Sequence, residues 1–299
     1  MAHRDVAARG ALIYRSGGGT TPTRAKCVMS AAQDYVWGTD PLEQRRLLEQ
    51  IKFYDSETAY LLDRLAIAPG SRAIDPGCGL LGITDRLAER VGPSGEVVGI
   101  ELEPRFVAMA NAILAERGFA NVKVMSGDAT ATGLPGGTFQ CVHERLLLIV
   151  LPKPENAIAE MVRLAEPGGA IAVEEVDICS WVCEPPHPAW APLIAAFEQV
   201  YTRDGKNVRI GRRLPGLLRA AGLENVRYKA HAQLNRPGDV HQTQLLVFVK
   251  LFWQKIIEAG LFKDDELTAL CRELEGHLAD PGTLVVSPLL FQAWGTKSR

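Results

Sequence analysis

The sequence predicts an α/β fold built on a mostly parallel β-sheet. Four short apolar runs have the length of buried strands; they occupy residues 72–74, 97–100, 122–125 and 139–142. Amphipathic segments of about 10–15 residues alternate with these runs, and that alternation is typical of βαβ units with parallel strands. Turns rich in glycine and proline, such as residues 92–95, separate the segments.

A helical cap is expected before the first strand. Residues 41–65 place their apolar side chains in a helical rhythm. Asp40 suits the N-cap position and Pro41 the first turn, so the stretch predicts one or two amphipathic helices. Ahead of it, residues 1–33 contain the run Ser-Gly-Gly-Gly-Thr-Thr-Pro and predict a flexible segment.

Further helices follow the strands. They are expected over residues 80–91, 104–117 and 154–165, and a fifth strand over residues 170–173. Pro104 opens one of these helices, and Gly118 closes it.

The C-terminal third departs from this rhythm. A short helix over residues 214–221 precedes a strand over 226–232, and residues 242–279 predict two helices broken near Gly260. Residues 284–294 are apolar enough for a closing strand. The two late strands flank a helical insertion, which favours an antiparallel edge pair over a second independent domain. We therefore expect a flexible segment at 1–33, a helical cap at 34–70, and one domain at 71–299 with a lid insertion at about 240–280.

Composition excludes several classes of protein. Hydrophobic residues make up 47% and charged residues 23% of the 299 residues, which excludes disorder for most of the chain. Lys and Arg total 33 against 35 Asp and Glu, so the chain lacks the excess of positive charge that is typical of proteins that bind nucleic acids or anionic membranes. The charged start, the lack of a long apolar run and six scattered cysteines predict a cytoplasmic protein with reduced thiols and no metal site.

The most informative segment is the glycine-rich turn after the first strand. Gly77, Gly79 and Gly82 match the pattern G-x-G-x-x-G, and Glu101 follows at the end of the next strand. That is the fingerprint of a dinucleotide site, in which a diphosphate sits on a helix N-terminus. Asp75 would repel a diphosphate there, and suits a ligand with a cationic group. Glu101 can accept hydrogen bonds from both hydroxyls of a ribose. A ligand with a ribose and a cationic group is therefore favoured, and S-adenosylmethionine has both.

At this point the chain resembles the class I S-adenosylmethionine-dependent methyltransferases over about residues 34–175. The matching segments, in family order, are residues 75–79, 99–101, 126–129, 139–147 and 166–169. The resemblance implies a Rossmann-like, seven-stranded, mostly parallel sheet with helices on both faces. It is nearest to the small-molecule branch, which includes enzymes of bacterial secondary metabolism. One departure is that Leu81 stands where the family often has glycine, with Gly82 one place later.

The resemblance also implies a set of cofactor-binding residues. Asp128 would face the adenine amino group, Glu144 and Arg145 would lie beside the methionine part, and Tyr35 would cover the bound cofactor. The full set is Tyr35, Asp75, Gly77, Cys78, Gly79, Glu101, Leu102, Gly127, Asp128, Ala129, Glu144 and Arg145. Cys78 is expected to contribute only its small size.

The methyl acceptor should lie beyond the carboxyl ends of the fourth and fifth strands. Methyl transfer is a direct displacement, so a general base is needed only for an acceptor that arrives protonated. The candidates are His143, Glu175 and Asp177. His143 also fits a purely structural histidine, and Trp181 with Trp190 suits either the wall of an apolar acceptor site or core packing.

Three other functions fit parts of the pattern. A nicotinamide-dependent oxidoreductase would share the glycine pattern, but Asp75 argues against it. A non-methylating member of the family would bind the cofactor without turnover. Methylation of a protein or RNA is disfavoured by the balanced charge. The expected partner is a small-molecule acceptor, and the N-terminal segment is a candidate for packing on a second copy of the chain.

Overall fold

The computed structural model describes residues 41–299 of the chain. The segment predicted over residues 1–33 and the predicted cofactor contact at Tyr35 lie outside the described residues. Within the described part no helix is both long and apolar enough to cross a bilayer. Five cysteines of this part carry free thiols, and no cluster of three or more potential ligands in it is arranged to hold a metal ion.

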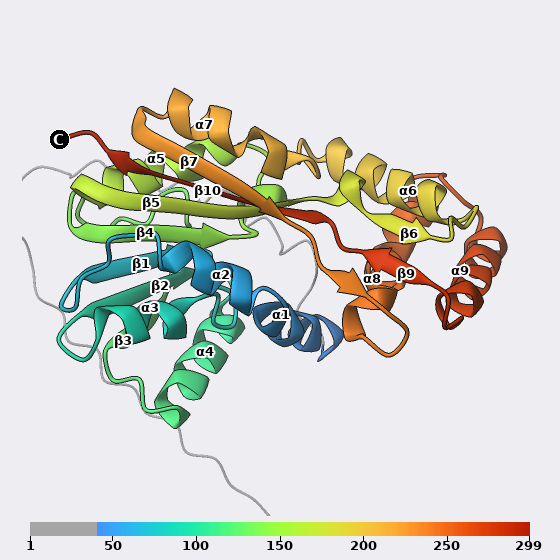
Figure 1. Ribbon diagram of the computed structural model, residues 1–299, viewed down its shortest axis with the longest axis horizontal. Helices are drawn as coiled ribbons and strands as arrows, with labels where there is room; N and C mark the ends of the chain where they lie inside the picture. The colour runs from blue at the N-terminus through green and yellow to red at the C-terminus, as the bar shows by residue number, and fades with distance from the viewer. Residues whose placement is uncertain (1–40) are drawn as a thin grey trace, which may run out of the picture. The chain divides into compact units, whose positions relative to one another are not determined.

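A seven-stranded sheet forms the centre of the fold, in the order β3-β2-β1-β4-β5-β10-β7 (Figure 1). The strands are β1 Arg72–Pro76, β2 Glu96–Glu101, β3 Val122–Ser126, β4 Phe139–Arg145, β5 Ala165–Asp177, β7 Leu223–His231 and β10 Leu289–Lys297. The first five pair in parallel, whereas β10 is antiparallel to both β5 and β7. This confirms the predicted seven-stranded, mostly parallel sheet and its antiparallel edge.

Helices cover both faces of this sheet. They are α2 Asp55–Leu62, α3 Thr84–Val91, α4 Pro104–Glu116, α5 Pro154–Leu164 and α7 Leu214–Ala220; α1 Pro41–Phe53 precedes α2 and contacts it. On one face, Leu61 of α2 and Leu87 of α3 pack with Ala73 of β1. On the other, Met161 of α5 packs with Ile74. Because neighbouring residues of a strand point to opposite faces, the alternation in β1 separates the two layers.

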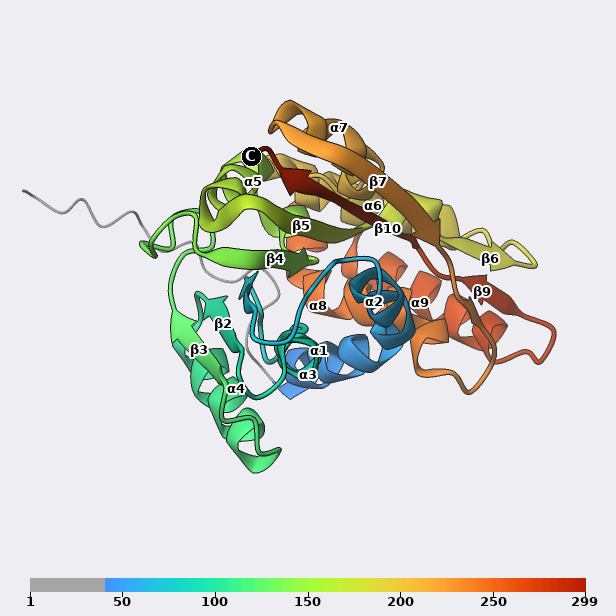
Figure 2. The ribbon, with the colours of Figure 1, turned by 60° about the vertical axis from the view of Figure 1, so that its left-hand side comes forward.

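The insertion before the last strand forms the two predicted helices, α8 Gln244–Glu258 and α9 Asp264–Leu278. They part at Gly260, which has a φ of 68°. A further helix, α6 Trp190–Arg203, packs against α8. Figure 2 shows α8 and α9 from a second side.

A small three-stranded sheet escaped prediction. It consists of β6 Val182–Glu184, β8 Leu234–Asn235 and β9 Leu284–Val286, in the order β6-β9-β8. The prediction of a single strand over residues 284–294 was therefore wrong. It is divided between two sheets, because Pro288 lacks the N–H that a ladder requires. Strands of two or three residues are also too short to show a period of two.

Candidate functional site

Asp75 and Gly82 fix the shape of the glycine-rich turn between β1 and α3. The Asp75 side chain is buried, and its Oδ2 accepts a hydrogen bond from the Ile83 N–H at 2.9 Å. Gly82 has a φ of 53°, and a Cβ at that position would collide with Asp75 Oδ2. The turn therefore closes directly over the acid. This explains why the chain has glycine at position 82.

The peptide between Gly82 and Ile83 is held from both sides. The N–H of this peptide, from Ile83, donates to Asp75 Oδ2. The carbonyl of the same peptide, from Gly82, accepts from Arg145 Nη2 at the end of β4, at 2.9 Å. The other guanidinium nitrogen, Nη1, donates to Thr58 Oγ1 of α2 at 2.8 Å. Arg145 therefore joins the turn to the helical cap.

Asp75 supplies negative charge beneath the turn. Burial raises its pKa from 3.8 to about 6, against the opposing effects of His143, the Ile83 N–H and Arg145. At neutral pH the carboxyl is still mostly ionised. A diphosphate over this turn would meet like charge, whereas a cationic group would be attracted.

The other two glycines of the turn differ in their surroundings: Gly77 packs closely against Leu147, and only Gly79 faces open space. Gly77 and Gly79 have φ of 80° and 57°, which favour glycine. A Cβ at Gly77 would lie 2.7 Å from Leu147 Cδ1, but at Gly79 it would meet nothing within 4 Å. Cys78 is buried, and burial raises its thiol pKa, so it packs as expected and carries no reactive thiolate.

Glu101 lies against the same turn from the end of β2. Its Oε2 accepts from the Gly79 N–H at 2.9 Å and its Oε1 from the Glu103 N–H at 2.8 Å. Burial raises the pKa of Glu101, and these backbone donors oppose that effect. Beside it, Leu102 is 52% exposed, which leaves an apolar surface next to the acid.

The predicted residues after β3 lie next to Glu101. The Gly127 N–H donates to the Glu101 carbonyl at 3.0 Å. Asp128 is exposed and accepts from the N–H and hydroxyl of Thr130, and Ala129 is buried. The structure thus brings the predicted residues that follow β1, β2 and β3 together at the carboxyl ends of these strands.

Two buried glutamates from β4 and β5 form what we call the acid pair, Glu144 and Glu175. Val173 is the register partner of Glu144, so Glu175, two residues on, shares its face. Glu144 Oε2 accepts from the Leu147 N–H at 3.0 Å, and Glu175 Oε1 from the Ile149 N–H at 3.1 Å. Their other oxygens have no hydrogen-bond partner among residues 41–299. Burial raises the pKa of both carboxyls, and their proximity adds to the rise at Glu144.

His143 and Glu174 lie on the opposite face, under α2. The His143 Nε2 and Glu174 Oε1 atoms are 2.8 Å apart. Glu174 Oε1 also accepts from Thr58 Oγ1 at 2.9 Å, and its Oε2 from Gln292 Nε2 at 2.7 Å. Both are fully buried. His143 is therefore held in a structural network and is separated from Glu175 by the sheet.

Asp177 is engaged at the end of β5. Its carboxylate forms an ion pair with Arg212, and its Oδ1 accepts from the Cys179 N–H at 3.1 Å as a cap of the next turn. Nearby, the buried rings of Trp181 and Trp190 meet edge to face at 5.7 Å. The Trp181 indole N–H has no partner within the described residues.

Sequence reasoning missed Thr58 and Gln292. Both sit in otherwise regular elements, and no sequence signal marks a single polar residue there as part of a buried network.

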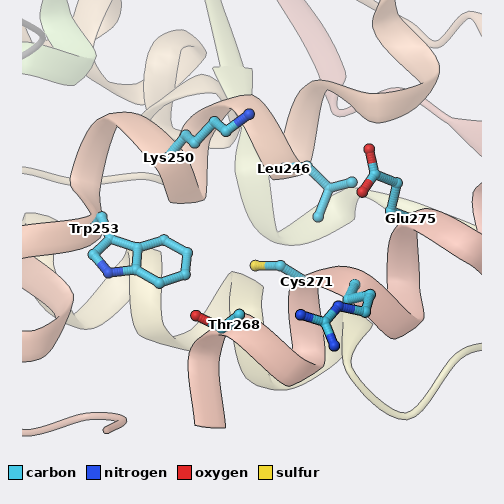
Figure 3. A pocket seen from close by; sticks show the side chains of 7 residues that line it. Leu246, Lys250, Trp253, Thr268, Cys271 and Glu275 are labelled. Atoms are coloured by element: carbon cyan, nitrogen blue, oxygen red, sulfur yellow. The ribbon is translucent and has the colours of Figure 1, made fainter. Parts of the chain in front are cut away.

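A separate hollow of about 250 Å³ lies between α8 and α9 (Figure 3). Trp253 and Lys250 of α8 face Cys271 and Glu275 of α9 across it. All its lining residues belong to these two helices, so it is not part of the glycine-turn site.

Residues 67–208 match the protein family described as "Methyltransferase domain". The chain contains a class I S-adenosylmethionine-dependent methyltransferase domain. This confirms the family predicted from the motifs; the individual contacts to cofactor and acceptor stay predictions.

Three named relatives are similar to this methyltransferase domain. The chain is 31% identical over 140 residues to demethylmenaquinone methyltransferase of Anoxybacillus flavithermus, covering 47% of this chain and 54% of that protein. It is 34% identical over 123 residues to nocamycin O-methyltransferase of Saccharothrix syringae (41% and 44% covered). It is 32% identical over 122 residues to aklanonic acid methyltransferase of a Streptomyces species (41% and 56%). The chain spans about half the length of these relatives.

Solved structures agree on the fold. A structure from Bacillus halodurans, described as a "putative methyltransferase", superposes with a TM-score of 0.53 at 15% identity, covering 82% of this chain and 100% of that one. Phosphoethanolamine N-methyltransferase 2 of Haemonchus contortus, solved with S-adenosyl-L-methionine, gives 0.50 at 15% identity (81% and 52% covered).

Proposed function

We propose that the protein transfers a methyl group from S-adenosylmethionine to a small-molecule acceptor by direct displacement. The observation that carries this proposal is the open glycine turn with ionised Asp75 beneath it and Glu101 beside it. An acid in each place suits a sulfonium-bearing nucleoside and disfavours the diphosphate of a nicotinamide cofactor.

The described residues fit such a cofactor. In this proposal Glu101 accepts from the ribose hydroxyls, the exposed side chain of Leu102 packs on the adenine, and Asp128 accepts from the adenine amino group. Glu144 and Arg145 hold the region of the methionine part; the cofactor contact expected at Tyr35 lies outside the described residues. When bound, the cofactor supplies an electrophilic methyl carbon, whose bond to sulfur breaks as the bond to the acceptor forms.

The acceptor in this proposal is a small, partly apolar metabolite of the kind made in secondary metabolism. Support comes from the relatives, whose names refer to demethylmenaquinone, nocamycin and aklanonic acid. Glu175 suits a proton-accepting role in its ionised form, because one of its oxygens has no partner in the described residues; burial raises its pKa to about 8, so the ionised form becomes more populated as pH rises towards 8. His143 Nε2 contacts Glu174 under α2, while its buried Nδ1 has no partner in the described residues, and Asp177 is paired with Arg212.

We also propose that the cap at 34–70 and the insertion at about 240–280 enclose the acceptor, in a cytoplasmic protein. The balanced charge of the chain supports an acceptor smaller than a nucleic acid.

Calorimetric titration with S-adenosylhomocysteine, the demethylated cofactor, tests the proposal. We expect saturable binding, and no binding of NADH in a parallel titration. Mass spectrometry of a metabolite pool incubated with S-adenosylmethionine should then reveal a product heavier by one CH₂. Absence of binding at millimolar ligand would overturn the proposal. Binding without any methylated product would point to a non-methylating member, and binding of NADH alone to an oxidoreductase.

A further inference from the structure

A chain of hydrogen bonds runs from α2 to the glycine turn through one arginine. Arg145 Nη1 donates to Thr58 Oγ1 at 2.8 Å, and Nη2 donates to the Gly82 carbonyl at 2.9 Å. The guanidinium is planar and rigid, so its two donors keep a fixed separation. The position of Thr58 on α2 therefore restricts the position of the Gly82 carbonyl.

Thr58 itself is fixed from behind. It is fully buried, and its hydroxyl accepts from Arg145 while donating to Glu174 Oε1 at 2.9 Å. A hydroxyl has a single proton to donate, so this arrangement sets its orientation. Glu174 is in turn held by His143 and Gln292 at 2.8 and 2.7 Å. The α2 end of this series of hydrogen bonds is thus fixed to buried side chains of the sheet.

At its other end, the series of hydrogen bonds holds one peptide group of the glycine turn. Its carbonyl, from Gly82, is bound by Arg145, and its N–H, from Ile83, is bound by Asp75. Rotation of this peptide would break both bonds, and α3 begins one residue later at Thr84. The orientation of the peptide thus controls how the turn at residues 77–83 enters the helix.

We propose that Thr58 and Arg145 are positioning residues that couple the docking of α2 to the binding-competent form of the glycine turn. The cofactor contacts assigned to this turn rest on the function proposed above. Coupling of this kind is reciprocal. A ligand on the turn should therefore stabilise α2, and loss of the Thr58 hydroxyl should loosen the turn.

The test compares Thr58→Val, which removes the hydroxyl at similar volume, with Thr58→Ser, which keeps it. By calorimetry, Thr58→Val should weaken S-adenosylhomocysteine binding roughly tenfold, the effect of one lost hydrogen bond to a charged group. Thr58→Ser should stay within about threefold of wild type. Ser56→Ala, an exposed change on the same helix, serves as the matched control and should leave affinity within about twofold.

Hydrogen exchange gives a readout that a merely destabilised protein would not reproduce. In wild type, the ligand should slow exchange in both residues 77–83 and residues 55–62. In Thr58→Val the slowing at 55–62 should be lost, and exchange at 77–83 should be faster even without ligand. Should Thr58→Val fail to fold, Arg145→Lys replaces it, because one ammonium cannot bridge both acceptors in the same geometry.

The ligand-free comparison separates this inference from the proposed function. If wild type does not bind the ligand, the proposed function fails, yet faster exchange at 77–83 in Thr58→Val would still support the coupling. Unchanged exchange at 77–83, or affinity within twofold of wild type in both Thr58→Val and Arg145→Lys, would overturn it.

Discussion

Replacing Asp75 by asparagine should stabilise the protein while weakening its ligand site. The folded protein holds the pKa of Asp75 at about 6, mainly through burial, against 3.8 for the ordinary group. Between these values the folded state binds the proton more tightly than the unfolded chain does. The free energy of unfolding therefore falls as pH rises from about 4 to 6, and stays flat above that window. The full difference corresponds to roughly 3 kcal/mol.

Asparagine has the same shape and keeps an oxygen to accept from the Ile83 N–H, but carries no charge. Asp75→Asn should therefore exceed wild type in urea-measured stability by up to roughly 3 kcal/mol at pH 8, and by about half of that at pH 5. Asp63→Asn, which removes a mostly exposed partner of Arg90, should change stability by less than about 1 kcal/mol at both pH values. The reasoning would be refuted if Asp75→Asn were less stable than wild type at pH 8, or if the difference in the free energy of unfolding were the same at pH 5 and pH 8.

Three further substitutions test neighbouring parts of the site. Glu101→Gln places an amide N–H₂ against the Gly79 or Glu103 N–H, and should weaken S-adenosylhomocysteine binding about 10- to 100-fold in calorimetry. Glu103→Gln, whose side chain caps α4 and pairs with Arg105, should change the affinity less than twofold. Gly82→Ala should lower the free energy of unfolding by more than Gly118→Ala does. Gly118 ends α4 in the left-handed conformation, and at both sites the positive φ costs alanine about 1–2 kcal/mol, but only at Gly82 would the Cβ meet Asp75; equal losses would contradict the account of the turn. Glu175→Gln removes a carboxyl whose pKa burial raises, so its stability relative to wild type should grow between pH 5 and pH 8 in denaturant titrations, and a constant difference would count against that pKa shift.

The parallel core was predictable because short apolar runs alternate with helical segments whose ends are marked by proline and glycine. Pro104 and Gly118 mark a helix that the structure has at Pro104–Glu116. The same reasoning could not resolve the split of residues 284–294, because the pairing partners of β9 and β10 lie far away in the sequence.

The glycine turn was predictable in kind, but its closing geometry was not. The G-x-G-x-x-G pattern and Asp75 indicated a cationic ligand. That Asp75 Oδ2 and Arg145 together hold the Gly82–Ile83 peptide depends on contacts across three elements. Thr58 illustrates the limit, since it reads as an ordinary residue of an amphipathic helix.

The acids at the carboxyl ends of β1, β4 and β5 differ in how their charge is compensated. Glu174 has the His143 ring and the nearby Arg145, and these hold its pKa below the ordinary value although burial acts in the opposite direction. Asp75 and Glu175 have raised pKa values, because burial outweighs their partners. Such carboxyls weaken the fold at neutral pH. A purely structural role would be served at least as well by an amide, and strongly shifted groups cluster at functional sites. Asp75 and Glu175 lie at the carboxyl end of the sheet, on opposite faces of it, and their raised pKa values therefore mark the chemistry of this chain more directly than His143, whose bond to Glu174 stabilises the layer beneath α2.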